Sequence, residues 1–393
     1  MTTRAVRGRP TRARPVVVHL TTTDMSLDWL LGPQLRAFGD AGYEVVGMSA
    51  PGPHVSSLVA MGVRHVPVPA FTRSSNPLDD VRAFVQVWRL LRRERPDVLH
   101  THNPKPGVLG RIAGRLAGVP LVVNTQHGLY AQPTDRRRRR WPVYTAERIA
   151  AAFGHMELVQ NPEDVDTLVK VLRVPARKVR LLGNGIDLDR FDPAAVAPDV
   201  RRRLRDEWGV APDDVLCGVV GRLVREKGIG EVLEAARLLQ MRSVPVRFVV
   251  IGPADTDKSD AVPADEMERA RAHGVVFTGQ RGDLPDCYTA MDVFVTASWR
   301  EGFPRAAMEA AAMRLPIVAA DVRGNRQVVV DEVTGLLFPV RDAAALAEQV
   351  SELAASPERR ATLGAAGRWK AEGEFDQRRI IEITLETYRA TRR

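Results

Sequence analysis

Residues 297–309 read Ala-Ser-Trp-Arg-Glu-Gly-Phe-Pro-Arg-Ala-Ala-Met-Glu, a stretch that contains two glutamates, Glu301 and Glu309. An apolar run ends just before it, and a helix-forming run begins at Pro304, whose missing N–H costs nothing in a first helical turn. The apolar segment that follows, 315–320, predicts another buried strand. We therefore expect Glu301 in a loop at the carboxyl end of a strand and Glu309 one or two turns inside the next helix. Parallel sheets bind ligands at such loops, and a helix start offers free N–H groups to an anion.

The same alternation of short apolar runs with helix-forming segments extends through the chain. It predicts strands at 15–20, 43–48, 63–68, 97–102, 121–125, 179–182, 215–220, 246–251, 275–279, 291–296, 315–320 and 334–339. Helical periodicity predicts helices between most of them, the first over 27–41 and a later one over 141–153. Strands that alternate with helices form parallel sheets covered on both faces, which is the α/β class.

The length of 393 residues favours two domains of ordinary size. A stretch rich in Pro, Ala and Asp, 191–200, marks the linker between them. We predict a disordered basic tail at 1–15, a first domain over 16–190 and a second domain over 191–376. A final amphipathic helix is predicted from residue 377 on.

Composition narrows the classes of function. The formal net charge of +9 suits an anionic partner such as a phosphate-bearing substrate, an anionic membrane surface or nucleic acid, although an arginine-favouring genome would account for part of it. Cys217 and Cys287 lie far apart without metal-like spacing, which fits a reducing compartment. No apolar run approaches the roughly 18 residues that span a bilayer, and the arginine-rich start lacks the apolar core of a secretory signal. We expect a cytoplasmic protein.

Polar loops follow the strands of the first half and are expected at one edge of its sheet, which makes that edge a candidate binding surface. His127 is the strongest candidate there, because it follows a buried strand and precedes Gly128. A lone histidine is otherwise more often a packed or surface imidazole. Lys105, in a second such loop, suits a phosphate as a point charge, with an ordinary exposed lysine as the equal alternative.

Five consecutive arginines, Arg136–Arg140, precede Trp141 and an amphipathic segment. Basic residues beside interfacial aromatic residues favour adsorption to an anionic membrane, where each charge contributes about 1 kcal/mol near the surface. A solvated loop is the alternative. Nucleic acid is less favoured, because no zinc-finger or RNP-like motif is present.

A glycine-rich loop with two cations, Arg222 and Lys227, follows the strand predicted at 215–220. Such a loop between a strand and a helix suits a diphosphate, and a solvated basic loop is the alternative. The phosphate loop G-x-x-x-x-G-K-[ST] and the dinucleotide fingerprint G-x-G-x-x-G are both absent here, which removes support from kinase-like and nicotinamide-dependent enzymes.

Seven residues separate Glu301 from Glu309, and a glycine follows the first. This pattern resembles the E-x7-E motif of retaining GT-B enzymes in glycosyltransferase family 4. Further segments match the donor-domain pattern of that family in order: Gly221-Arg222-Leu223 with Lys227, Gly252, Phe277-Thr278-Gly279, Glu301–Glu309 and Thr334–Leu337. Segments 100–105 and 124–128 resemble the subgroup that extends lipid-linked glycans and capsular polysaccharides. The resemblance covers about residues 15–390.

The resemblance implies a GT-B fold, with two facing Rossmann-like domains, a deep cleft between them, and a last helix, 377–393, that packs back on the first domain. It also implies roles for individual residues. Those implied at the reacting sugar are His127 and Glu301. Those implied for the donor are Arg222, Lys227, Gly302, Phe303 and Glu309, and those implied for the acceptor are Thr22, Asn103 and Lys105. No cofactor or metal is implied, because fixed cations and dipoles stabilise the departing diphosphate. Asp255 and Asp257 imitate a GT-A metal motif in the wrong architecture.

One departure from the family pattern is Thr21–Asp24, where many relatives carry a Gly-Gly pair. The expected function is retaining transfer of a sugar from a nucleotide-sugar, expected to be UDP-linked, to a lipid-linked or envelope glycan. Expected partners are that donor, that acceptor and, through Arg136–Arg140, an anionic membrane at the inner face of the plasma membrane; nucleic acid is not expected. The alternatives are a GT-B-like nucleotide-sugar epimerase and a basic nucleic-acid- or membrane-binding protein with a vestigial site.

Overall fold

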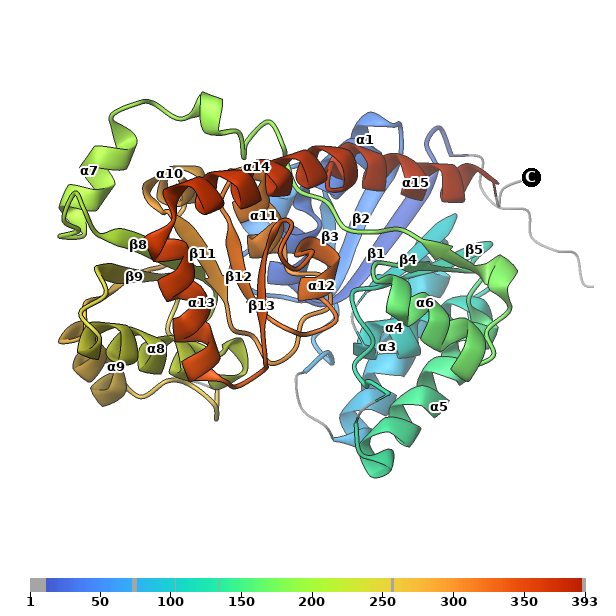
Figure 1. The fold of residues 1–393 in the computed structure, drawn as a ribbon. Helices are drawn as coiled ribbons and strands as arrows, with labels where there is room; N and C mark the ends of the chain where they lie inside the picture. The colour runs from blue at the N-terminus through green and yellow to red at the C-terminus, as the bar shows by residue number, and fades with distance from the viewer. Residues whose placement is uncertain (1–11, 73–75, 103, 134, 256–257, 391–393) are drawn as a thin grey trace, which may run out of the picture. The chain divides into compact units, whose positions relative to one another are not determined.

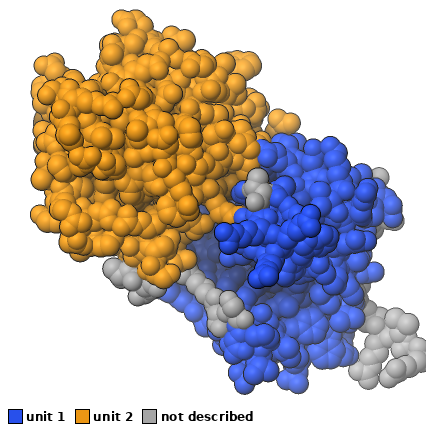
Figure 2. All heavy atoms as spheres, turned by 60° about the horizontal axis from the view of Figure 1, so that its bottom comes forward, with its two compact units in different colours: residues 1–182, 381–393 blue, residues 183–380 orange. Residues whose placement is uncertain are grey.

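The structure is a computed structural model that describes residues 12–72, 76–102, 104–133, 135–255 and 258–390. Most of the tail predicted at 1–15 thus lies outside the described residues. The chain divides into two compact units, coloured separately in Figure 2: residues 1–182 with 381–393, and residues 183–380.

Residues just after the first boundary belong with the second unit because of backbone pairing. The N–H of Ile186 donates to the carbonyl of Phe375 at 2.8 Å, and the N–H of Gln377 donates to the carbonyl of Ile186 at 3.0 Å. The sequence placed this boundary at 190/191, where composition changes. In the structure the boundary between the two units lies earlier, between Leu182 and Gly183.

The first unit contains a seven-stranded parallel sheet with the order β3-β2-β1-β4-β5-β6-β7. Its strands are β1 (Val16–Thr23), β2 (Glu44–Ala50), β3 (Arg64–Pro67), β4 (Val98–His102), β5 (Leu121–Gln126), β6 (Met156–Val159) and β7 (Val179–Leu181). Its helices are a π-helical turn (Ser26–Leu30), α1 (Gly32–Asp40), α2 (Val55–Ala60), α3 (Pro77–Glu94), α4 (Pro104–Leu116), α5 (Arg137–Phe153), α6 (Pro162–Asp166), a second π-helical turn (Thr167–Val171) and a 3-10 turn (Ala176–Lys178). The β-branched runs that predicted the central strands are buried on both faces, as a parallel sheet requires.

Two helices of this unit differ from their predicted bounds. The predicted helix 27–41 is divided at residue 31 into a π-helical turn and α1, because Pro33 has no N–H for a continuous helix. The predicted helix 141–153 begins earlier, at Arg137, so that four of the five arginines form its first turn. Arginine has a high helix propensity, which outweighs the pattern signal of an exposed charged run.

The helices cover the first sheet on both faces. Chain order runs from β1 outward to β3 and then from β4 outward to β7, and right-handed crossovers therefore place α1 and α2 on one face and α3 to α5 on the other. The last helix, α15 (Gln377–Ala390), starts in the second unit and ends in the first. There Tyr388 is fully buried and packs against Phe38 of α1, with ring centroids 5.6 Å apart.

The second unit contains a six-stranded parallel sheet with the order β10-β9-β8-β11-β12-β13. Its strands are β8 (Val215–Val220), β9 (Val246–Ile251), β10 (Val275–Gly279), β11 (Val293–Thr296), β12 (Ile317–Ala320) and β13 (Gly335–Phe338). Its helices, besides the start of α15, are a 3-10 turn (Pro193–Ala195), α7 (Val200–Glu207), a 3-10 turn (Arg225–Lys227), α8 (Ile229–Met241), α9 (Ala264–Arg271), α10 (Leu284–Ala290), α11 (Arg305–Ala312), α12 (Asn325–Val328), α13 (Ala343–Ala355) and α14 (Pro357–Glu374). Each face of the sheet carries its own apolar cluster.

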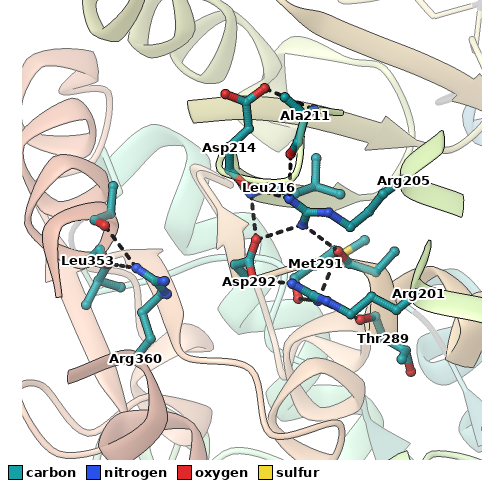
Figure 3. A network of polar contacts seen from close by, with 12 residues as sticks. Arg201, Arg205, Ala211, Asp214, Leu216, Thr289, Met291, Asp292, Leu353 and Arg360 are labelled. Atoms are coloured by element: carbon teal, nitrogen blue, oxygen red, sulfur yellow. Dashed lines mark hydrogen bonds and ion pairs between the residues drawn. The ribbon is translucent and has the colours of Figure 1, made fainter. Parts of the chain in front are cut away.

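A partly buried ionic network fixes α7 to the central strands of this sheet (Figure 3). Asp292, just before β11, accepts from Arg201 at 2.6 Å, from Arg205 at 2.9 Å and from the N–H of Leu216 at 2.8 Å. Burial opposes ionisation of this carboxyl, but the N–H group and the two guanidinium groups outweigh it and lower its pKa. Buried charges of this kind are tolerated because they are paired.

Both sheets have one point where the strand order reverses, between β1 and β4 in the first and between β8 and β11 in the second. Loops that leave such a pair of strands turn in opposite directions, and ligands of open α/β sheets bind in the crevice between them. None of the described helices is long and apolar enough to cross a membrane.

Candidate functional site

An ion pair joins the two loops at the reversal point of the second sheet. Lys227, after β8, and Glu301, after β11, approach to 2.5 Å between Nζ and Oε1. Both side chains are partly exposed, Lys227 by 31% and Glu301 by 15%. The two residues predicted to hold a diphosphate and a sugar are therefore brought together, with their charges facing solvent-accessible space.

Two glycines allow the neighbouring loops to approach this pair. Gly228 has φ +70, and a Cβ there would lie 2.1 Å from the carbonyl oxygen of Ala297. Gly324, in the loop after β12, would place a Cβ 2.6 Å from the backbone of Glu301. The loops after β8, β11 and β12 are thus in backbone contact, which fixes where the carboxylate of Glu301 stands.

A cavity of about 170 Å³ opens beside the ion pair and at the start of α11. The polar side chains that line it are Lys227, Thr296, Ser298, Glu301 and Arg305. The first three residues of α11, Arg305 to Ala307, line this cavity, and the free N–H groups of a helix start favour an anion there. Ligand pockets for whole small molecules measure roughly 300–1,000 Å³, so the cavity fits one charged group of a larger ligand.

A larger hollow lies in the first unit, away from this ion pair. It measures about 870 Å³ and is lined by residues of α1, α2 and the amino ends of β2 and β3, among them Arg36 and Arg64. Ligands of parallel sheets bind at the carboxyl ends of the strands, so this position does not mark the site of chemistry.

Glu309 is the fifth residue of α11 and is 5% exposed. Its carboxylate accepts from the hydroxyl of Tyr288 at 3.0 Å and from Nε of Arg305 at 3.1 Å. Burial raises its pKa, although Arg305 and Tyr288 both act in the opposite direction. The carboxylate is therefore held in one position before any ligand arrives.

The other predicted donor residues have partners in the free protein. Arg222, after β8, is paired with Asp255, after β9, at 2.8 Å. The ring of Phe303 packs edge-on against Phe375 at 5.8 Å, and its carbonyl accepts from the side chain of Asn184 at 3.3 Å. Gly302 precedes it in the same loop, while Asp257 lies outside the described residues.

His127 lies in the first unit, directly after β5. Its Nε2 is 3.0 Å from Nδ1 of His102, at the end of β4, and Nε2 of His102 is 3.0 Å from Nδ1 of His19 in β1. Burial lowers the pKa of His127 to about 4, against a hydrogen bond with Gln160 that acts in the opposite direction, and lowers the pKa of His19 to about 3. All of these imidazoles are therefore neutral near pH 7.

The predicted acceptor residues lie at the same edge of the first sheet. Thr22 is near the carboxyl end of β1, and Lys105 is in the first turn of α4. The ammonium of Lys105 is 2.8 Å from the carboxylate of Asp80 in α3. Asn103 lies outside the described residues.

The sequence analysis did not predict the residues that position the predicted ones, among them His19, His102, Asp255, Tyr288 and Arg305. The contact of Arg305 with Glu309 could have been predicted, because residues four apart on a helix are neighbours. His102 carried a weaker signal, since it ends the strand that runs beside the strand of His127. Asp255 was considered as part of a metal motif and for sugar or acceptor recognition, and not as the partner of Arg222. Tyr288 carried no signal.

Comparison with known proteins identifies the family. The model described as "Glycosyl transferases group 1" matches residues 200–370, and the model described as "Glycosyltransferase Family 4" matches residues 34–190. The UDP-Gal:alpha-D-GlcNAc-diphosphoundecaprenol alpha-1,3-galactosyltransferase of Escherichia coli is 32% identical over 282 residues, which are 71% of this chain and 72% of that protein. The chain belongs to glycosyltransferase family 4.

Other similar proteins span the chain more fully. The capsular polysaccharide biosynthesis glycosyltransferase CapM of Staphylococcus aureus is 25% identical over 95% of this chain and 96% of its own length. The crystal structure of Anabaena Alr3699/HepE in complex with UDP shares the fold, with a TM-score of 0.78 and 20% identity over 96% of this chain and all of that one. This family 4 protein is a glycosyltransferase built from two Rossmann-like domains, as the sequence predicted.

Proposed function

We propose that this glycosyltransferase moves a sugar from a UDP-sugar to a glycan linked to a lipid diphosphate, with retention of anomeric configuration. The Lys227–Glu301 pair at the reversal point of the second sheet carries this proposal. A cation, a carboxylate and a helix start meet there around a cavity of the size of a charged group. A nucleotide-sugar has a matching sequence of parts, with a diphosphate next to a sugar.

Donor binding is an exchange of partners. Lys227 leaves Glu301 for the diphosphate, and Arg222 leaves Asp255 for the same group. The freed carboxylate of Glu301 then accepts hydroxyl groups of the sugar, and Glu309 accepts those of the ribose, while the N–H groups near Gly302 and Phe303 face phosphate. The name of the E. coli relative specifies a UDP-sugar, and the Anabaena neighbour was crystallised with UDP, which supports UDP as the nucleotide.

Retention follows from attack on the same face as departure. The bond between the anomeric carbon and the diphosphate oxygen breaks, and a bond forms from the acceptor oxygen to that carbon. The proton of the acceptor hydroxyl passes to the leaving diphosphate oxygen. Fixed cations and the start of α11 stabilise the developing charge, and the reaction in this proposal needs no metal.

The acceptor belongs at the carboxyl edge of the first sheet, near His127, Thr22 and Lys105. Two relatives support a lipid-linked or envelope glycan: one is named for GlcNAc-diphosphoundecaprenol and the other for capsular polysaccharide. Such an acceptor lies in a membrane, so the enzyme must reach the bilayer.

The start of α5 suits that contact. Arg136–Arg139 are exposed there, and the Trp141 side chain is 61% exposed, one turn after the first arginines. Tyr144 and Ala150 are buried and fix the helix to the unit. In this proposal the arginines bind anionic lipids at the cytoplasmic face while Trp141 enters the interface.

Isothermal titration with UDP, GDP and ADP tests the donor half. We expect UDP to bind best, and Lys227→Met to weaken it at least about tenfold, since charge-assisted hydrogen bonds are worth roughly 1.5–3 kcal/mol. Lys170→Met, at an exposed lysine paired with Asp166, is the matched control and should leave the Kd within about twofold. Equal binding of all three nucleotides, or an unchanged Kd in Lys227→Met, would contradict the proposal.

Transfer itself is tested with a UDP-sugar panel, a short polyprenyl-diphosphate sugar and anionic or neutral vesicles, with and without EDTA. We expect an α-linked product from an α-linked donor by NMR, unchanged rates in EDTA, and faster transfer on anionic vesicles. An inverted product would overturn the proposed retention, and a metal requirement would overturn the proposed metal-independent reaction.

A further inference from the structure

Three histidines of the first unit form a hydrogen-bonded chain through its buried sheet. His19 in β1 contacts His102 in β4, and His102 contacts His127 after β5, each at 3.0 Å between nitrogens. The ring planes of His19 and His102 are nearly parallel, at 16°, and those of His102 and His127 are tilted by 34°. His19 and His102 are 0% and 1% exposed. This histidine chain spans the point where the strand order of the sheet reverses, between β1 and β4.

Three neutral rings in such a chain have only two proton arrangements. Each ring carries one N–H, and each of the two contacts needs one donor and one acceptor. If His102 carries its proton on Nδ1, then His19 and His127 must carry theirs on Nδ1 as well. If His102 carries it on Nε2, all three must do so. The proton of one ring therefore sets the protons of the other two.

The buried end of the chain selects between these arrangements. Nε2 of His19 is buried and has no hydrogen-bond partner among the described residues. In the Nε2–H arrangement that atom would be an unsatisfied N–H, which is rare in folded proteins. In the Nδ1–H arrangement it is only an unused lone pair, on a ring that stacks on Phe38 with centroids 5.3 Å apart.

We propose that His19 and His102 are positioning residues, which fix His127 as the Nδ1–H tautomer and leave that N–H as the donor for the sugar that is transferred. The hydrogen bond of His127 with Gln160 gives way when the sugar binds. This inference rests on the proposed function, which places His127 at that sugar. Nε2 of His127 is occupied as an acceptor from His102, so the ring acts as a hydrogen-bond donor and not as a base. The acceptor proton then goes to the leaving diphosphate.

A metal site is the competing interpretation of these histidines. His19, His100 and His102 offer nitrogens within 4.8 Å of one another. The rings of His100 and His102 are stacked, however, with centroids 4.3 Å apart and planes at 28°. Lone pairs in nearly parallel planes do not converge on one ion. Both nitrogens of His100 are also engaged, by the hydroxyls of Tyr388 at 2.5 Å and Thr125 at 2.7 Å.

The test is the tautomer of His127, measured by two-bond 15N–1H NMR on the 15N-histidine-labelled full chain without ligand. In the wild type we expect a protonated Nδ1 and a bare Nε2. His102→Phe keeps the ring but removes both nitrogens, and should give a mixture of tautomers. His102→Asn keeps a donor near the former Nδ1 and should restore the wild-type signature.

Kinetics provide the second readout. His102→Phe should lower kcat at least about tenfold with the KM for the UDP-sugar changed less than twofold, and His102→Asn should recover most of the loss. His100→Phe is the matched control, because it removes an equally buried imidazole of β4 that lies outside the chain. It should lower the melting temperature while the His127 tautomer stays unchanged.

An Nε2–H signature for His127 in the wild type, or a signature unchanged in His102→Phe, would overturn the proposal. So would stoichiometric zinc bound with loss of both N–H signals. The NMR result does not depend on turnover. An Nδ1–H signature without any sugar transfer would therefore overturn the proposed function and leave the chain of histidines standing.

Discussion

Lys227 and Glu301 form an ion pair of 2.5 Å between the loops after β8 and β11, at the point where the strand order of the second sheet reverses. In the free protein each residue neutralises the other. A diphosphate must therefore displace a carboxylate before it gains its cation. Binding and catalysis consequently place opposite demands on Glu301, and the two can be separated by one substitution.

Glu301→Gln should tighten UDP binding while it slows transfer. Partly exposed ion pairs are worth about 0–1 kcal/mol, so release of Lys227 should lower the Kd for UDP by at most about fivefold. Loss of the carboxylate at the sugar should lower kcat by about 100-fold. Isothermal titration measures the Kd for UDP, and initial rates of transfer measure kcat. Glu234→Gln, at an exposed glutamate of α8, is the control, and weaker UDP binding in Glu301→Gln would contradict the exchange of partners.

Gly228→Ala should unfold the second unit more easily than Gly209→Ala. Both glycines have positive φ, +70 and +64, but only Gly228 faces a carbonyl oxygen at 2.1 Å, whereas Gly209 faces open space. The backbone alone costs about 1 kcal/mol at each position. In urea unfolding we expect Gly228→Ala to lower the free energy of unfolding by at least about 2 kcal/mol more than Gly209→Ala does. We also expect Gly228→Ala to weaken UDP binding. Equal losses would show that the loops move apart freely.

Asp292→Asn should be among the more costly single changes in the second unit. It leaves Arg205, which is 8% exposed, without its carboxylate, and removal of one partner from a buried pair costs about 3–5 kcal/mol. Asp321→Asn removes an exposed partner of Arg326 and should cost about 0–1 kcal/mol. Denaturant unfolding compares the two variants. A similar loss in both would mean that solvent screens the Asp292 network.

Acid should destabilise the protein through its buried histidines. His19 has a pKa of about 3 in the folded chain, against about 6.5 when unfolded, so between these values only the unfolded chain binds the proton. The free energy of unfolding should therefore fall by about 1.4 kcal/mol per pH unit below 6.5 for this group. Urea unfolding between pH 7 and 5 measures how the free energy of unfolding depends on pH. In His19→Phe this slope should be smaller by the contribution of one proton. Equal slopes for the two proteins would show that His19 does not titrate on unfolding.

The periodicity of the sequence predicted the position of Glu309 and every described strand except β6 (Met156–Val159), which no expected strand covered. Val16 to Val18 and Val246 to Ile251 are β-branched or apolar runs of strand length, and they form central strands. The E-x7-E spacing also fell on a loop and a helix, as expected from the apolar runs on either side. These features depend on neighbours in the sequence, which a pattern reports directly.

Contacts between distant segments could not be predicted in the same way. Lys227 and Glu301 are 74 residues apart, and their pairing depends on β8 lying beside β11. The chain from His19 to His127 depends on the register that sets His19 opposite His100. Alternation along a strand shows that His100 and His102 share a face, but not which neighbour they meet. Strand order and register carried that information, and no local motif encodes them.

The first unit cannot complete its fold until the whole chain has been synthesised, because helix α15 supplies its last segment. Tyr388 completes the core around Phe38 and Tyr43, although 206 residues separate it from Leu182, where the rest of that unit is already made. At roughly 5–20 residues per second, a ribosome needs about 10–40 s to cover that distance. During this interval Phe38 and Tyr43 of the nascent first unit lack the ring of Tyr388, and we expect a chaperone to cover them until α15 is made.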